Sequence, residues 1–97
     1  MTATPIQGVS RFAIDAQPFW IGAGDNNHIV ISADPTVSWN HACIENSGGE
    51  LYLLDNHATN GVTVNGRRLE TNARLCLRPG DQIRIGATVF SFESHRG

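Results

Sequence analysis

Short apolar runs recur along this chain, and within them apolar and polar positions alternate as they do in β-strands. In residues 82–85 the alternation predicts that Ile83 and Ile85 face a core while the residues between them face water. The same pattern predicts that Phe90 and Phe92 point inward. No window long enough for a helix repeats apolar residues at helical spacing without a Gly, Pro or Asn interrupting it.

These runs predict a chain of about ten or eleven short strands. The strands that can be placed lie near residues 11–15, 18–21, 28–31, 42–46, 50–54, 62–64, 67–69, 74–77, 82–85 and 88–93. Many short strands with regular turns between them are typical of an all-β sandwich, although the pattern alone does not choose a topology. We expect one domain over residues 9–93, with flexible termini at 1–8 and 94–97.

Two Asn-Gly pairs mark tight reversals, because Asn and Gly tolerate positive φ. Asn65-Gly66 lies between two of the predicted strands and predicts a β-hairpin. Asn60-Gly61 follows the run at 50–54, so Thr59 and Asn60 fall in a loop at the end of a strand. Polar side chains in such a loop are well placed to bind a ligand.

Composition limits the possible functions. At 97 residues and 40% hydrophobic content, the chain can bury a modest core without a metal or a disulfide framework. A net charge of −2 argues against nucleic-acid binding, which normally needs a basic face. The absence of a long apolar run predicts no transmembrane helix and no membrane contact by this segment.

The two cysteines bear on the compartment. Cys43 and Cys76 are far apart in apolar contexts, and we interpret them as two buried thiols that behave as small hydrophobes. A disulfide between them stays open. The N-terminus has no basic segment followed by an apolar one, so no secretory signal is expected. These features favour a reducing, cytoplasmic location.

Six short motifs occur in a fixed order. They are Ile21-Gly22, Ser38 with His41, Thr59-Asn60-Gly61, Asn65-Gly66, Gly80-Asp81 and Ile85-Gly86. In this order they resemble the forkhead-associated (FHA) family of phosphothreonine-peptide readers, over roughly residues 18–93. The resemblance implies a β-sandwich of two packed, mostly antiparallel sheets with the binding loops at one end.

The resemblance also implies a role for each matched residue. Ser38 matches the family's phosphate-contacting serine, Thr59 a residue beside the phosphate, and Asn60 the asparagine that bonds the backbone of the bound peptide. A purely structural turn role for these residues stays open, and the two roles can coexist. His41 is implied to be buried and to join nearby loops, and Gly22 and Gly61 to be structural. The candidate binding residues are Ala23, Ser38, Trp39, Asn40, Thr59 and Asn60.

The chain departs from the family pattern beside the phosphate. Ala23 stands where the family has Arg, Trp39 where relatives often have Arg or Lys, and Ala58 where they often have Ser. A hydrogen bond to a charged group contributes about 1.5–3 kcal/mol, so losing one weakens affinity roughly ten- to hundredfold. We therefore expect weak or absent phosphothreonine recognition. Compensating cations could come from His57, Arg67 or Arg68.

Three functions follow from these residues. The first is a non-catalytic protein–protein interaction module whose phosphothreonine recognition is weakened or lost. The second is a working phosphothreonine reader that uses compensating cations. The third and most remote is a hydrolase built from Ser38, His41 and Asp55 or Asp81, although no Gly-x-Ser-x-Gly motif is present.

No cofactor or metal is expected, because the histidines are scattered and lack zinc spacing. The expected partner is a protein or a peptide. An exposed Trp39 would anchor such a partner, and a ring folded onto the sandwich is the alternative. Trp20, between Phe19 and Ile21, is expected in the core.

Overall fold

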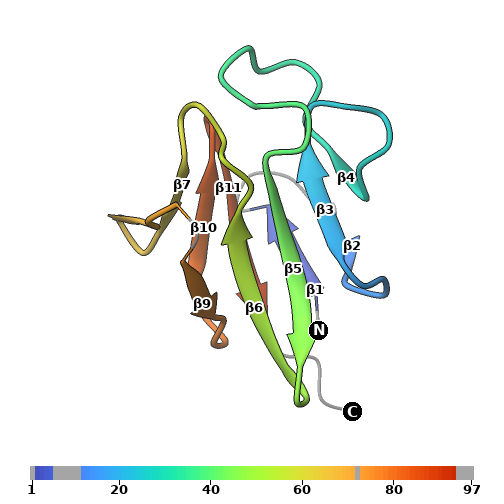
Figure 1. Cartoon of the computed structure of the whole chain (residues 1–97), viewed down its shortest axis with the longest axis vertical. Helices are drawn as coiled ribbons and strands as arrows, with labels where there is room; N and C mark the ends of the chain where they lie inside the picture. The colour runs from blue at the N-terminus through green and yellow to red at the C-terminus, as the bar shows by residue number, and fades with distance from the viewer. Residues whose placement is uncertain (1, 6–11, 72, 94–97) are drawn as a thin grey trace.

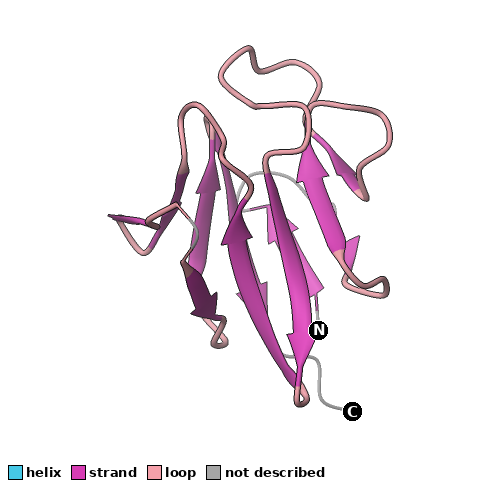
Figure 2. Ribbon diagram, viewed as in Figure 1, coloured by secondary structure: helices cyan, strands magenta, loops and turns pink. Residues whose placement is uncertain are grey.

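The structure, a computed structural model, describes residues 2–5, 12–71 and 73–93 (Figure 1). These residues form eleven strands in two sheets and no helix (Figure 2). One sheet has the order β2 (Phe12–Ala13), β1 (Thr2–Pro5), β11 (Thr88–Glu93), β10 (Gln82–Ile85), β7 (Val62–Val64) and β8 (Arg67–Arg68). The other has the order β4 (Ile29–Val30), β3 (Phe19–Gly22), β5 (Ala42–Ser47), β6 (Glu50–Asp55) and β9 (Arg74–Cys76). No segment of the described residues is a helix that could span a membrane.

The core lies between the two sheets and is built from alternate residues of their strands. The expectation for Ile83, Ile85, Phe90 and Phe92 is confirmed, because all four are buried. The pairings are antiparallel except for β3 with β4, which is parallel. The prediction of a mostly antiparallel two-sheet sandwich is therefore confirmed.

The hairpin predicted at Asn65-Gly66 is present between β7 and β8. Both turn residues have positive φ, 52° for Asn65 and 81° for Gly66, as the turn type requires. The Asn65 side chain also donates to Asp81 and accepts from the backbone of Gln82, each at 2.9 Å. This turn therefore fixes both the hairpin and its neighbour β10.

The N-terminal strand differs from expectation. Thr2–Pro5 forms β1 and pairs with β11 from Thr2 opposite Glu93 to Pro5 opposite Phe90, although flexibility was expected over residues 1–8. No alternation of large apolar residues marks this segment in the sequence, and its place in the sheet is seen only from its pairing with β11. Residues 1, 6–8 and 94–97 lie outside the described residues, so the remaining termini stay a prediction.

Two core expectations need correction. Trp20 is only half-buried, because its neighbours Phe19 and Ile21 point inward and successive strand residues alternate. Cys43 is buried, as predicted, and burial raises the pKa of its thiol to about 11. Cys76 is half-buried, and its thiol donates to the Glu50 carboxylate at 3.0 Å, which raises the pKa of Cys76. Both thiols are free.

Candidate functional site

The candidate site lies where the loops after β3, before β5 and before β7 meet at one end of the sandwich, at the top of Figure 1. Backbone bonds join the first two loops. The Ala23 N–H donates to the Ser38 carbonyl at 2.9 Å, and the Gly24 N–H donates to the Trp39 carbonyl at 3.0 Å. Residues far apart in the sequence are therefore held side by side.

His41 links these loops to the third. Its ring is fully buried, with 0% exposed. Nδ1 accepts the Ser38 backbone N–H at 2.9 Å, so Nε2 carries the proton and donates to the Gly61 carbonyl at 2.6 Å. This is the loop-joining arrangement that the family resemblance implies.

The glycines at this end stand where loops approach closely. A Cβ on Gly22 would lie 2.8 Å from the His41 backbone nitrogen and would also collide with the Trp39 carbonyl oxygen. Gly61 has φ of +68°, and a Cβ there would lie 2.7 Å from Nε of Arg68. Gly22 therefore requires glycine for space, and Gly61 requires it for its backbone conformation.

Ser38, Thr59 and Asn60 come together across the first and third loops. The Thr59 N–H donates to Oγ of Ser38 at 3.3 Å, and the Ser38 hydroxyl keeps its own proton to donate. Nδ2 of Asn60 donates to the Thr36 carbonyl at 2.9 Å. Thr59 and Asn60 are exposed and Ser38 is half-buried, so all three can be reached from solvent.

Trp39 lies on the outside of the site. It is 63% exposed, which settles the alternative left open by the sequence. Its indole rests on the backbone of Gly24, since a Cβ at Gly24 would collide with the ring. Ala23 is half-buried and packs against the core. No Lys or Arg occurs between residues 12 and 66, so none of the three loops carries one.

A network of asparagines stiffens the loops, and the sequence did not reveal it. Asn27 is buried, and its Nδ2 donates to the carbonyls of Gly24 at 2.7 Å and Trp39 at 2.6 Å. Asn40 donates to Oδ1 of Asn27 at 3.0 Å, and Asn56 donates to the Asn40 carbonyl at 3.0 Å. The side-chain amide of Asn40 therefore already makes a hydrogen bond within the loops and is only partly available to a ligand. In the sequence alone, the polar residues at 25–27 indicate only a turn.

Asp34 fastens the second loop to the turn between β10 and β11. Its carboxylate accepts the hydroxyl and the backbone N–H of Thr36, and the N–H of Ala87 at 2.7 Å. The Thr36 hydroxyl first, then these backbone donors, hold the pKa of Asp34 below its ordinary value. Next to this turn, a groove of about 550 Å³ is lined by Asn60, Gly61 and Arg84, among others.

The three cations considered for compensation lie in different places. The Arg68 guanidinium lies against Gly61, beside the third loop. Arg67 lines a separate groove next to β9. His57 is exposed within the third loop, with φ of 55°.

Ser38, His41 and Asp55 or Asp81 do not form a catalytic triad. His41 uses both ring nitrogens on backbone groups and leaves none to serve as a general base for Ser38. Asp55 accepts the Ala58 N–H, and Asp81 is bonded by Asn65 and the Arg78 backbone. Among the described residues, no three His, Cys, Asp or Glu side chains lie close enough to hold a metal ion.

Comparison with known proteins agrees with this fold. Residues 19–86 match the family model of the FHA domain, so the chain belongs to the FHA family. FHA domains are non-catalytic protein-interaction modules that bind phosphothreonine peptides. The predicted family is confirmed, as is the expectation of a protein or peptide partner.

Two relatives illustrate the breadth of the family. The FHA domain-containing protein FhaB of Mycobacterium tuberculosis is 32% identical over 80 residues, which are 82% of this chain and 50% of the relative. The mouse angiogenic factor with G patch and FHA domains 1 is 34% identical over 95% of this chain and 14% of its own length. The chain thus spans about half the length of FhaB.

Solved structures show the same fold. An FHA domain from a study of phosphothreonine-dependent FHA interactions has a TM-score of 0.87 and 27% identity, covering 98% of this chain and 96% of its own. The FHA domain of FhaA, solved in complex with the intracellular domain of Rv3910, has a TM-score of 0.82 and 27% identity over 93% of this chain and 96% of its own. Mycobacterium tuberculosis EmbR, solved with a low-affinity phosphopeptide, has a TM-score of 0.88 and 28% identity over 99% of this chain and 25% of its own.

Proposed function

We propose that this domain is a protein–protein interaction module in which phosphothreonine binding is weak or lost. The observation that supports the proposal is that the loops holding Ser38 and Thr59 contain no Lys or Arg of their own. Ala23 occupies the position of the family's Arg, and the three loops carry no Lys or Arg. A phosphate dianion would meet hydroxyl and amide donors there, without the bidentate guanidinium that makes such contacts strong.

Trp39 gives the same surface another means of binding. Its ring is 63% exposed and held flat on Gly24, next to Ser38. A large aromatic ring that is already positioned loses little entropy on binding, and aromatic residues dominate the energetics of many interfaces. In this proposal Trp39 contacts the partner, while Ser38, Asn40, Thr59 and Asn60 supply the surrounding hydrogen bonds.

A second candidate function is favoured by Arg68. Its guanidinium lies against Gly61, directly after Thr59 and Asn60, and no Lys or Arg of the loops competes for that role. If Arg68 turns toward a bound phosphate, the domain is a working phosphothreonine reader. The relatives solved in studies of phosphothreonine-dependent interactions or with a phosphopeptide support this alternative by analogy.

Titration with a phosphothreonine peptide library and its unphosphorylated counterpart tests the main proposal. We expect weak or no phosphate-dependent binding by the natural chain. Ala23→Arg should tighten binding roughly ten- to hundredfold, because it adds charge-assisted bonds. Ala23→Gln, of similar length and without charge, is the matched control and should not. Low-micromolar, phosphate-dependent binding by the natural chain would contradict the proposal.

Two further variants separate the candidates. Ser38→Ala abolishes phosphopeptide binding by a reader but affects an interaction module little. Arg68→Ala abolishes it if Arg68 supplies the cation, and Arg68→Lys then restores only part, since an ammonium lacks the planar fork. We place the domain in the cytoplasm, a proposal that its two free thiols support.

A further inference from the structure

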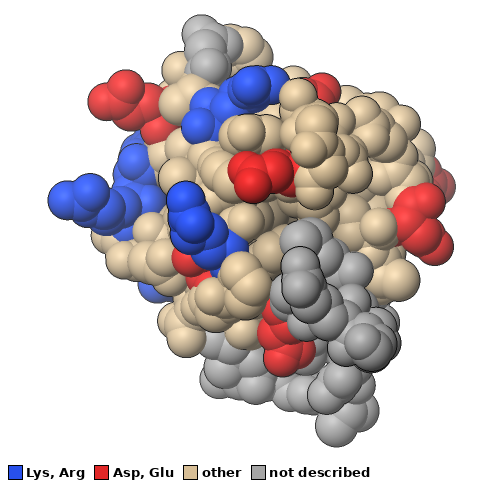
Figure 3. Space-filling model, turned by 90° about the horizontal axis from the view of Figure 1, so that it is seen from below, with Lys and Arg blue, Asp and Glu red and all other residues tan. Residues whose placement is uncertain are grey.

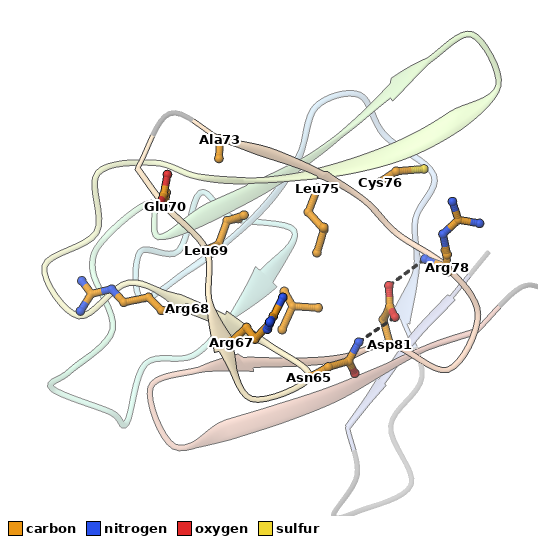
Figure 4. Close-up of a pocket in the computed structure, with 11 residues that line it drawn as sticks. Asn65, Arg67, Arg68, Leu69, Glu70, Ala73, Leu75, Cys76, Arg78 and Asp81 are labelled. Atoms are coloured by element: carbon orange, nitrogen blue, oxygen red, sulfur yellow. Dashed lines mark hydrogen bonds between the residues drawn. The ribbon is translucent and has the colours of Figure 1, made fainter.

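A second concave surface lies away from the loops, between the β8 hairpin, β9 and the turn that precedes β10. It is a groove of about 450 Å³, within the size range of ligand pockets (Figure 4). Leu69 and Leu75 point into this space from the two sides, and both pack on the core. The floor is therefore apolar.

Two arginines flank this apolar floor. Figure 4 shows Arg67 and Arg78 on either side of it, while Arg68 is turned away. Arg67 and Arg78 are exposed, and neither guanidinium has an ion pair or hydrogen bond to another described residue. The nearby Asp81 carboxylate is already occupied by the Asn65 side chain at 2.9 Å and the Arg78 backbone N–H at 2.8 Å. The two cations are therefore available to a partner.

The charge of the whole chain is distributed unevenly. Residues 12–66 contain six acidic residues and no Lys or Arg, whereas residues 67–84 contain five arginines and two acidic residues. In Figure 3 the cationic side chains, which are all arginines, gather toward one side of the face, and the acidic ones are scattered. A domain with a net charge of −2 thus has a local cationic surface around this groove.

The groove also lies at the edges of both sheets. β8 is the last strand of the six-stranded sheet and β9 the last strand of the five-stranded one. An edge strand offers unpaired backbone groups to an incoming extended chain. The surface therefore suits an extended segment better than a helix.

We propose that this groove binds an extended acidic segment of a partner protein. A large aliphatic side chain of the segment inserts between Leu69 and Leu75, and carboxylates on either side pair with Arg67 and Arg78. Nucleic acid fits the site less well, because the lining holds no aromatic ring for base stacking and the domain is net acidic. The proposal does not depend on whether the loop end reads phosphothreonine.

The test is an NMR titration of the ¹⁵N-labelled 97-residue chain. The probe is a blocked acidic hexapeptide, Asp-Glu-Leu-Leu-Asp-Glu. We expect saturable shifts confined to residues 64–69 and 74–81, and weaker binding as salt is raised. A peptide with Ser in place of both leucines, and one with Asn and Gln in place of the acids, should each bind at least tenfold more weakly. A dT oligonucleotide serves as the nucleic-acid competitor.

Charge reversal provides the matched variants. Arg67→Glu should weaken binding of the acidic peptide about tenfold or more. Arg74→Glu makes the same charge change on β9, but Arg74 lies over the Tyr52 ring, 4.6 Å from its centroid, and does not line the groove. It should weaken binding less than threefold. Arg67→Gln repeats the test if the reversed charge disturbs folding.

Four results would overturn the proposal: no saturable shift, shifts centred on Ser38 and Thr59, equal losses for Arg67→Glu and Arg74→Glu, or tighter binding of the oligonucleotide to the same residues. A failure here leaves the Ala23→Arg experiment unaffected, because that variant changes the other end of the domain.

Discussion

The loop end and the β8–β9 edge of this domain are two surfaces that differ in how they are built and in the charges they carry. At the loop end, backbone amides, asparagines and a buried histidine fix the geometry, and the three loops themselves contain no Lys or Arg. At the β8–β9 edge, Leu69 and Leu75 form an apolar floor, and the guanidinium groups of Arg67 and Arg78 beside it pair with no other residue of the described part of the chain. The loops of the first surface supply shape without cationic side chains, whereas the second surface supplies both shape and cations.

At the loop end, the residues that hold the loops in place are different from residue 23, where the family pattern has a charged side chain. Gly22, His41 and Gly61 hold the loops through close approaches and buried hydrogen bonds. None of these contacts involves residue 23, whose side chain only packs against the core. A change from Arg to Ala at that position can therefore remove charge from the site and leave its shape intact.

The largest effect should come from breaking the scaffold at His41. His41→Ala leaves the Ser38 N–H and the Gly61 carbonyl unsatisfied near the core, at about 1–3 kcal/mol for each group. We expect the free energy of unfolding, measured in urea, to fall by roughly 2–6 kcal/mol. His57→Asn is the control, because His57 is exposed and Asn tolerates its positive φ. Equal losses in the two variants would contradict the role assigned to His41.

A smaller loss of stability is expected at Gly22. The Cβ of Gly22→Ala meets the backbone of Trp39 and His41, which cannot move without disturbing the loops, and overpacking of this kind costs about 1–3 kcal/mol. Gly24→Ala meets only the exposed Trp39 ring, a side chain that can shift by the small distance needed without disturbing the backbone of the loops. Gly24→Ala should therefore destabilise less, and it should shift the NMR signal of the Trp39 indole N–H. A greater loss at Gly24 would show that the ring is fixed.

These variants probe features that differ in how far the sequence predicts them. The Asn65-Gly66 hairpin and the inward-facing Ile83 and Ile85 were predictable, because turn chemistry and strand alternation are local. The family motifs supplied the topology and the expectation that the loops holding Ser38 and Thr59 meet at one end of the sandwich. Alternation should also have placed Trp20 outward, between Phe19 and Ile21, but its hydrophobicity favoured the core instead.

Features that depend on tertiary contacts were not predictable. β1 has no apolar pattern and owes its place to pairing with β11. The Asn27 amide is buried because it bonds carbonyls of two loops that cross in the folded chain. In the sequence, an Asn with this role looks the same as an Asn in an ordinary turn. The position of the exposed Trp39 ring depends on Gly24, because the ring packs against the Gly24 backbone where a side chain would otherwise be. The position of Arg68 against Gly61 likewise comes from the hairpin in three dimensions.

A second positive charge added at the loop end should give that surface the cations that the β8–β9 edge already has. In the Ala23→Arg background, Trp39→Arg introduces a second cation beside Ser38. We expect a further increase of about tenfold in affinity for phosphothreonine peptides, measured by calorimetry. Trp39→Gln in the same background is the uncharged control. No gain from Trp39→Arg over Trp39→Gln would show that position 39 does not face the phosphate.

The smallest effect concerns the loop fastened by Asp34. Because the Thr36 hydroxyl and the backbone N–H groups of Ala87 and Thr36 lower the pKa of Asp34 in the folded state, its carboxylate stabilises this loop. That contribution is fully present above the ordinary value of 3.8 and is lost as pH falls through the lower folded pKa. The amide signals of Thr36 and Ala87 should therefore move together below pH 3.8. Asp34→Asn should abolish this transition, whereas Asp25→Asn, in the exposed part of the neighbouring loop, should retain it. If both variants keep the transition, a group other than the Asp34 carboxylate holds the β10–β11 turn to the loop end, and the role assigned to Asp34 is wrong.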